Sequence, residues 1–199
     1  MRTTALVCAS ILLLSCSSEP RPETVRYLMR STSEGRSGQA AASVGLRRVT
    51  VASYLQSEGL VLETEQNEIR SARYHQWAEP LEYGLRSLLQ GELSAQLGYD
   101  VDDSAVLLPD WQYSLDVDVD QLHGTSAGEA LLVASWRLTA LHAPNDSASE
   151  RVDERHFFRA TQPLPREGYA ALVETEIALL RQLAAAIAES VQALAPSEG

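Results

Sequence analysis

The chain has 199 residues and a formal charge of −11, with 27 carboxylates against 16 basic residues that are all arginine. An acidic surface is repelled by phosphate backbones, so the charge disfavours a nucleic-acid partner. The length suits one domain with a sizeable core and leaves little room for two. The lack of lysine fits either arginine-based interface chemistry or codon bias in a GC-rich genome, and we favour the second explanation.

The N-terminus has the pattern of a bacterial lipoprotein signal peptide. Arg2 provides the positive start, and the apolar run at 5–14 follows it. That run is about ten residues long, which suits a signal sequence and is too short to span a bilayer. Leu13 and Ser15, three residues and one residue before Cys16, match the lipobox. Cys16 is therefore the predicted lipidation site, and the alternative is an ordinary secretory signal in which this cysteine is incidental.

The signal predicts how the rest of the chain is organised. Residues 1–15 would be removed, 16–23 would form a lipidated tether, and 24–199 would form the domain. Ser17, in place of aspartate, favours sorting to the outer membrane. Cys8 would leave with the signal peptide, and Cys16 would carry lipid. The mature domain would then have no thiol for a disulfide, a metal site or a nucleophile.

The first third of the chain is predicted to be rich in strands. Segments 24–29 and 44–55 have alternating apolar residues, and the alternation of the second slips at Arg47 and Arg48, which indicates a bulge or a strand end. Segments 60–65 and 68–74 flank a plausible hairpin turn at Gln66 and Asn67.

A helix is predicted at 79–97. Pro80 fits its first turn and Gly98 fits the position after its last turn. Gly84 and Gly91 inside it would each cost about 1 kcal/mol against alanine, and we interpret them as marks of close packing against a sheet. The apolar stripe of this helix is Leu81, Leu85, Leu88, Leu89, Leu93 and Leu97.

The second half predicts an antiparallel meander and a closing helix. A short apolar segment at 105–108 precedes three alternating segments at 113–122, 129–141 and 151–161, which are joined by local turns. The helix at 168–194 has apolar residues spaced by three and four, a stripe that fits packing on a sheet better than a coiled-coil seam. The sequence therefore predicts an α+β fold, a single domain with a mainly antiparallel sheet and two long helices packed on it.

Two rows of charged residues lie on neighbouring predicted strands. Asp116, Asp118 and Asp120 resemble the start of a calcium loop, but Gln121 and Ala127 stand where glycine and glutamate are needed. The three carboxylates are instead predicted to form a solvated strand face. Arg137 is predicted to lie between this acidic row and a basic row, which comprises Arg151, Arg155 and Arg159 with Asp153 among them.

No catalytic, cofactor-binding or metal-binding residue is predicted. The four histidines have no helical metal-ligand spacing, and the motifs of serine hydrolases and of nucleotide-binding loops are lacking. His156 is predicted to be a neutral core histidine on the face of Phe158. The histidines are His75, His123, His142 and His156.

Several segments together resemble the PqiC-like auxiliary lipoproteins of ABC-type intermembrane transport systems. The most specific is the tryptophan, acid, proline and leucine run at 77–81, within the longer match at 73–81. Segments 49–55, 116–119 and 136–138 fit the same pattern. The chain departs from the family at Ala52, where proline is common, and at 56–59.

This resemblance implies a membrane-anchored periplasmic accessory of an MCE/ABC-type lipid transport system. It would stand at the outer membrane as a non-catalytic adaptor, with an MCE-domain tunnel protein and ABC permease components as partners. The alternative is a lipoprotein that itself carries lipid in an apolar pocket. A lipoprotein hydrolase is a third possibility, for which the sequence nominates no serine.

Overall fold

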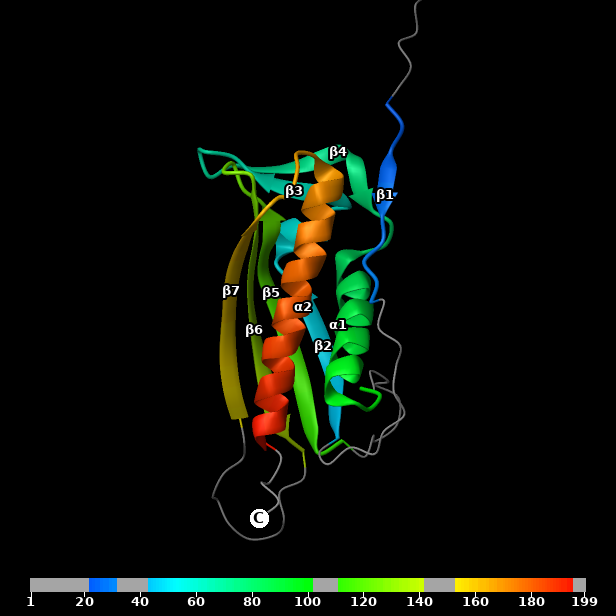
Figure 1. Cartoon of the computed structure of the whole chain (residues 1–199), viewed down its shortest axis with the longest axis vertical. Helices are drawn as coiled ribbons and strands as arrows, with labels where there is room; N and C mark the ends of the chain where they lie inside the picture. Colours follow the sequence, from blue (N-terminus) through cyan, green and yellow to red (C-terminus); the bar gives the residue numbers. More distant parts are fainter. Residues whose placement is uncertain (1–21, 32–42, 102–110, 142–152, 195–199) are drawn as a thin grey trace, which may run out of the picture.

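The computed structural model describes residues 22–31, 43–101, 111–141 and 153–194. Figure 1 shows two helices side by side on one face of the long strands, with two shorter strands across one end. The elements are β1 (Val25–Tyr27), β2 (Val44–Val51), the 3-10 helix η1 (Ser53–Gln56), β3 (Gly59–Glu63), β4 (Ile69–Trp77), α1 (Leu81–Leu97), β5 (Tyr113–Gly124), β6 (Glu129–Ala140), β7 (Asp153–Pro163) and α2 (Tyr169–Leu194).

The strands form one mixed sheet, so the prediction of a mainly antiparallel sheet is wrong. Its order is β1-β4-β3-β5-β6-β7, and β2 also pairs with β5. Three of the six pairings among the described strands are parallel, namely β1 with β4, β2 with β5 and β3 with β5. Each parallel pair joins strands that are separated by at least one other element, because a parallel partner requires a crossover. Local periodicity identifies a strand but carries no information about the direction of a distant partner.

The predicted meander of β5, β6 and β7 is confirmed as two antiparallel pairings. Of the bulge or strand end predicted at Arg47 and Arg48, the structure shows the bulge, since the register of β2 against β5 shifts between Leu46 and Arg48 while the strand continues to Val51. A second shift, between Val119 and Gln121 in β5, was not predicted. At the first of these irregularities, both Arg47 and Arg48 lie beside Asp116. The predicted segment at 105–108 lies outside the described residues.

The β3–β4 hairpin turns where it was predicted, although the sequence lacks the favoured glycine. Asn67 adopts a left-handed φ of 60°, a conformation that asparagine tolerates better than most residues. Its amide donates to the carbonyl of Thr64 at 3.0 Å, and the amide of Thr64 donates to that of Glu68 at 2.9 Å. Asparagine thus supplies the backbone freedom for which glycine is usually chosen.

Helix α1 confirms the prediction for this segment and revises the role of its glycines. The helix starts directly after Pro80 and ends at Gly98, whose φ is 80°. A Cβ at Gly91 would lie 2.5 Å from the Cβ of Ser31, and one at Gly84 would lie 3.2 Å from that of Met29. The glycines therefore admit the chain that follows β1, not a sheet face.

The core lies between the helix pair and the sheet. The stripe of α2 is mostly buried there, which supports packing on the sheet over a coiled-coil seam. Trp136 of β6 faces α2 and donates its indole N–H to Ser190 Oγ at 3.0 Å. Its neighbour Arg137 consequently points to the opposite face of the sheet. The buried members of the α2 stripe are Val173, Leu180, Ala184, Ile187 and Val191.

Candidate functional site

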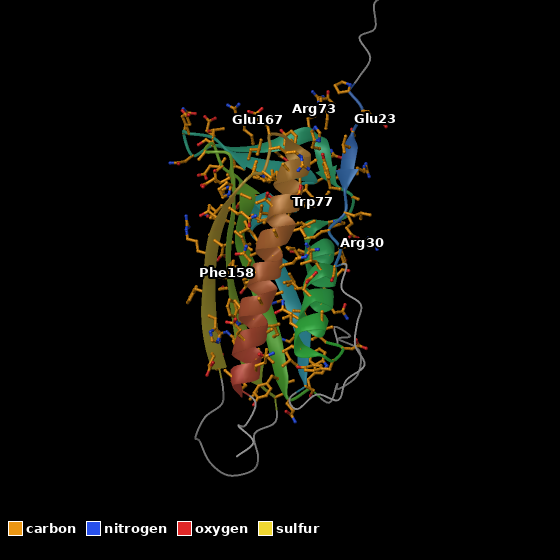
Figure 2. All side chains as sticks on the ribbon, viewed as in Figure 1. Glu23, Arg30, Arg73, Trp77, Phe158 and Glu167 are labelled. Atoms are coloured by element: carbon orange, nitrogen blue, oxygen red, sulfur yellow. The ribbon has the colours of Figure 1, made fainter. Side chains whose placement is uncertain are left out.

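The described chain starts at one end of the molecule, and the predicted lipid anchor would attach the protein to the membrane at this end. Figure 2 shows Glu23 at the same end as Arg73 of β4 and Glu167 before α2. From there β1 pairs with β4, with Tyr27 opposite Trp77. We call this the tether end. Cys16 itself lies outside the described residues, so its lipidation stays a prediction.

A stack of three rings holds the tether end together. The hydroxyl of Tyr27 lies 3.0 Å from Nδ1 of His75, and the two ring centroids are 6.1 Å apart. The His75 ring stacks on Tyr169 at 4.1 Å, with 20° between the ring planes. Burial raises the pKa of Tyr27 above its ordinary value. His75 thus joins the first strand to the start of α2, a role that its sequence position did not reveal.

An apolar pocket of about 220 Å³ adjoins this stack through Tyr169. Gly124, at the end of β5, lies against two of its leucines. A Cβ there would lie 2.6 Å from Leu62 Cδ2 and 3.2 Å from Leu172 Cδ1. Glycine therefore allows the leucines to close over the strand end. The pocket is lined by Leu62, Leu164, Gly168, Tyr169 and Leu172.

The sheet face that is turned away from the helices carries the charged rows. We call this face, which β2, β5, β6 and β7 form, the outer face. Arg48, Asp116, Arg137 and Arg155 stand opposite one another on four adjacent strands. Arg137 therefore lies between an acidic and a basic residue, as predicted. Arg151 of the predicted basic row lies outside the described residues.

The prediction of a solvated acidic face is wrong for Asp116. This residue is only 3% exposed, because Arg47 donates Nε to its Oδ1 at 2.9 Å and Nη2 to its Oδ2. The hydrogen bond raises the pKa of Arg47. Asp118 accepts from Thr50 Oγ1 and is half-buried, and only Asp120 is exposed. The bulge at Arg47 supplies the partner, which strand periodicity alone could not place.

These side chains surround a depression of about 300 Å³ on the outer face, here the arginine depression. Arg137 extends from it to Asp153, with Nη1 at 3.0 and 3.1 Å from the two carboxylate oxygens. Arg155 donates to Ser135 Oγ at 3.3 Å. The depression is lined by Arg47, Arg48, Asp116, Asp118, Ser135, Trp136, Arg137 and Arg155.

The other histidines are structural side chains. His156 shares a face with Phe158, as predicted, and stacks on Trp136 at 5.0 Å between ring centroids. Its Nε2 lies 3.3 Å from Glu154 Oε2 but forms no hydrogen bond with a described residue. His123 is buried against Tyr54 and the carbonyl of Gly124. Within the described ranges, no three metal-ligating side chains gather, and His142 lies outside them.

Glu176 is a buried acid that the sequence analysis missed. It is 1% exposed in the middle of α2, and its Oε2 has no hydrogen-bond partner in the described part of the chain. Desolvation raises its pKa to about 8, so the carboxyl is mostly neutral at pH 7. The signal was present in the spacing, because Glu176 lies three residues after Val173 and four before Leu180. The apolar stripe instead passes through Ile177, which is only partly buried.

Comparison with known proteins identifies the family. The family of the ABC-type transport auxiliary lipoprotein component matches residues 27–188. The chain belongs to this family. The family resemblance that was based on the run at 73–81 is thereby confirmed. The protein is an auxiliary transport lipoprotein. No helix in the described ranges is long and apolar enough to cross a membrane.

The relatives of this auxiliary lipoprotein cover most of its length. The intermembrane transport lipoprotein PqiC of Escherichia coli (strain K12) is 26% identical over 197 residues, which cover 98% of this chain and 100% of the relative. A crystal structure of an uncharacterized protein has a TM-score of 0.71 at 23% identity and covers 85% and 99% of the two chains. A protein from Xanthomonas campestris has a TM-score of 0.56 at 16% identity, with 83% and 92% covered. These two structures support the fold alone.

Proposed function

We propose that this protein is a non-catalytic adaptor of an MCE/ABC-type intermembrane lipid transport system, anchored at the outer membrane through lipidated Cys16. The observation that carries the proposal is the full-length similarity to an intermembrane transport lipoprotein, together with the family match over 27–188. Its partners are an MCE-domain tunnel protein and ABC permease components.

The place where the described chain starts supports the anchoring part of the proposal. The tether of eight residues at 16–23 spans about 2.6 nm when fully extended, at roughly 3.3 Å per residue. Its last residue, Glu23, lies at the tether end, two residues before β1 (Figure 2), so this end would face the membrane closely. The remaining surfaces, including the outer face, would be presented to the periplasm and to partners.

The second candidate function is direct carriage of lipid, and the observation that bears on it is the apolar pocket beside Tyr169. Its volume of about 220 Å³ is below the roughly 300–1,000 Å³ of typical small-molecule sites. A whole phospholipid is larger than the ligands of such sites, so the pocket supports the adaptor over the carrier. Native mass spectrometry of the domain at 24–199, purified without detergent, separates the two. Reproducible co-purified lipid would favour the carrier.

The adaptor role is tested by affinity purification of the full-length protein, tagged at its C-terminus, from solubilised envelopes of its own host. We expect an MCE-domain protein and ABC permease components to be enriched over a control lipoprotein of similar abundance. Recovery of neither, under conditions that preserve a known envelope complex, would count against the proposal. Cross-linking before solubilisation extends the test to weak contacts.

A further inference from the structure

Two arginines stand directly opposite each other on the outer face, and neighbouring carboxylates do not neutralise both of their charges. Arg137 of β6 is paired in register with Arg155 of β7. Directly opposed side chains in an antiparallel pair have Cβ atoms about 5 Å apart, and like charges in that position are destabilising. Such a pair lowers the stability of the sheet at this position. Locally destabilising arrangements of this kind are expected at functional sites.

The neighbouring carboxylate neutralises only one of the two guanidinium groups. Arg137 turns along the strand to Asp153, which accepts from it with both oxygens. Arg155 has Ser135 Oγ at 3.3 Å and lies 5.1 Å above the ring of Phe157. In the described part of the chain, no carboxylate lies within 4.0 Å of the Arg155 guanidinium. Its positive charge therefore faces the arginine depression unpaired.

The aspartates of the depression are bound to other side chains. Asp116 is held by Arg47 in a two-pronged hydrogen bond, and Asp118 accepts from Thr50. Arg48 reaches Asp116 only at 4.0 Å. With Asp153 included, four guanidinium groups meet three carboxylates, so this region is positive in a chain whose formal charge is −11.

We propose that the arginine depression binds a phosphate group, held by Arg155 and Arg137 with the Ser135 hydroxyl below it. The guanidinium fork matches oxyanions in geometry and charge. Ser135 accepts from Arg155, so its own proton is available to donate to an oxygen of the ligand. Arg137 keeps Nη1 on Asp153, which leaves its Nε and Nη2 groups for a ligand beside the Arg155 guanidinium and the Ser135 hydroxyl. This set of donors from two strands suits the three or four oxygens of a phosphate better than the two coplanar oxygens of one carboxylate. The group can come from free phosphate or from a phosphate ester such as a lipid headgroup.

This inference is independent of the proposed function, because it uses no membrane, anchor or transport partner. It also explains why the like-charged pair persists on an otherwise alternating face. A bound phosphate would turn the mutual repulsion of the two arginines into attraction by a shared anion. The volume of about 300 Å³ leaves room beyond the phosphate for the group to which it is esterified.

The test is a titration of the domain at 24–199 with inorganic phosphate at constant ionic strength, followed by NMR chemical shifts and by calorimetry. The variants are Arg155→Gln and the matched control Arg73→Gln, an exposed arginine that lies 5.6 Å above Tyr74 at the tether end. We expect saturable binding by the unmodified domain, roughly tenfold weaker binding in Arg155→Gln and little change in the control. Arg155 is exposed, and circular dichroism verifies that its variant folds.

Further probes separate the possible sources of the phosphate. Glycerol 3-phosphate and vesicles that contain phosphatidylglycerol represent the headgroup, and tighter binding of these than of inorganic phosphate would assign the site to lipid. Binding of inorganic phosphate alone would assign it to the free ion. The proposal is overturned if none of the phosphate probes binds saturably, or if both variants lose binding equally. It is also overturned if an oligoglutamate peptide binds there and phosphate does not, because the site would then recognise an acidic protein segment.

Discussion

At the scale of single residues, Glu176 couples the stability of this protein to pH. Its pKa is raised from 4.5 to about 8 by burial in α2. Between these two values the unfolded chain has released the proton while the folded chain still holds it. The free energy of unfolding therefore falls as pH rises through this window, by up to about 1.4 kcal/mol per pH unit from this group. Below this window the titration of Glu176 does not lower the free energy of unfolding, and above it the decrease is complete.

Glu176→Gln should flatten this dependence, because the amide does not titrate. Urea unfolding at several pH values between about 5 and 8 measures the slope. The control is Glu174→Gln on the same helix, since Glu174 is 59% exposed in a surface pair with Arg166. It should leave the slope of the unmodified protein intact. Equal slopes in all three proteins would mean that Glu176 is solvated in solution.

At the scale of elements, the parallel junction of β2 with β5 depends on one glycine. Gly45 lies in β2, and a Cβ built on it would be 1.9–2.3 Å from three ring atoms of Trp111. Trp111 lies two residues before the start of β5 and is 7% exposed. The indole therefore packs flat on the glycine, which keeps the two strands aligned at the start of their pairing.

Gly45→Ala should lower the free energy of unfolding by about 1–3 kcal/mol, the usual cost of overpacking. Trp111→Leu removes the indole ring that the new methyl group would meet, although this change has its own cost in stability. Chemical denaturation of both single variants and of the double variant forms a thermodynamic cycle. We expect the double variant to be more stable than the sum of the single effects predicts. Strict additivity would contradict the proposed steric contact.

At the scale of the whole molecule, one thiol is expected to decide where the protein resides. Cys16→Ala should release the protein from the membrane fraction with its fold intact, because the domain begins beyond the tether. Cys8→Ala is the matched control and should remain at the membrane, since that thiol precedes the predicted cleavage point. Cell fractionation, metabolic labelling with palmitate and circular dichroism of the released protein provide the readouts. Release of the Cys8 variant, or retention of the Cys16 variant, would refute the assignment of the anchor.

Features with a local cause could be predicted from the sequence. The helix between Pro80 and Gly98 and the meander of β5, β6 and β7 depend on turn residues and on periodicity within one segment. The bulge at Arg47 was visible as a slip in alternation. The family was recognisable from the run at 77–81, which marks the junction of β4 with α1.

The tertiary structure alone decided which distant segments meet. The parallel pairing of β2 with β5 brings Arg47 to Asp116, 69 positions apart, and so buries a carboxylate that periodicity assigned to solvent. The sequence placed Arg137 beside a basic row, but only the strand register shows that Arg155 is the residue opposite it. The lack of a carboxylate for Arg155 among the described residues likewise follows only from the tertiary contacts of its neighbours. Hydrophobic patterns act over a few residues, whereas strand direction and the pairing of charges are set by long-range packing, which no local pattern encodes.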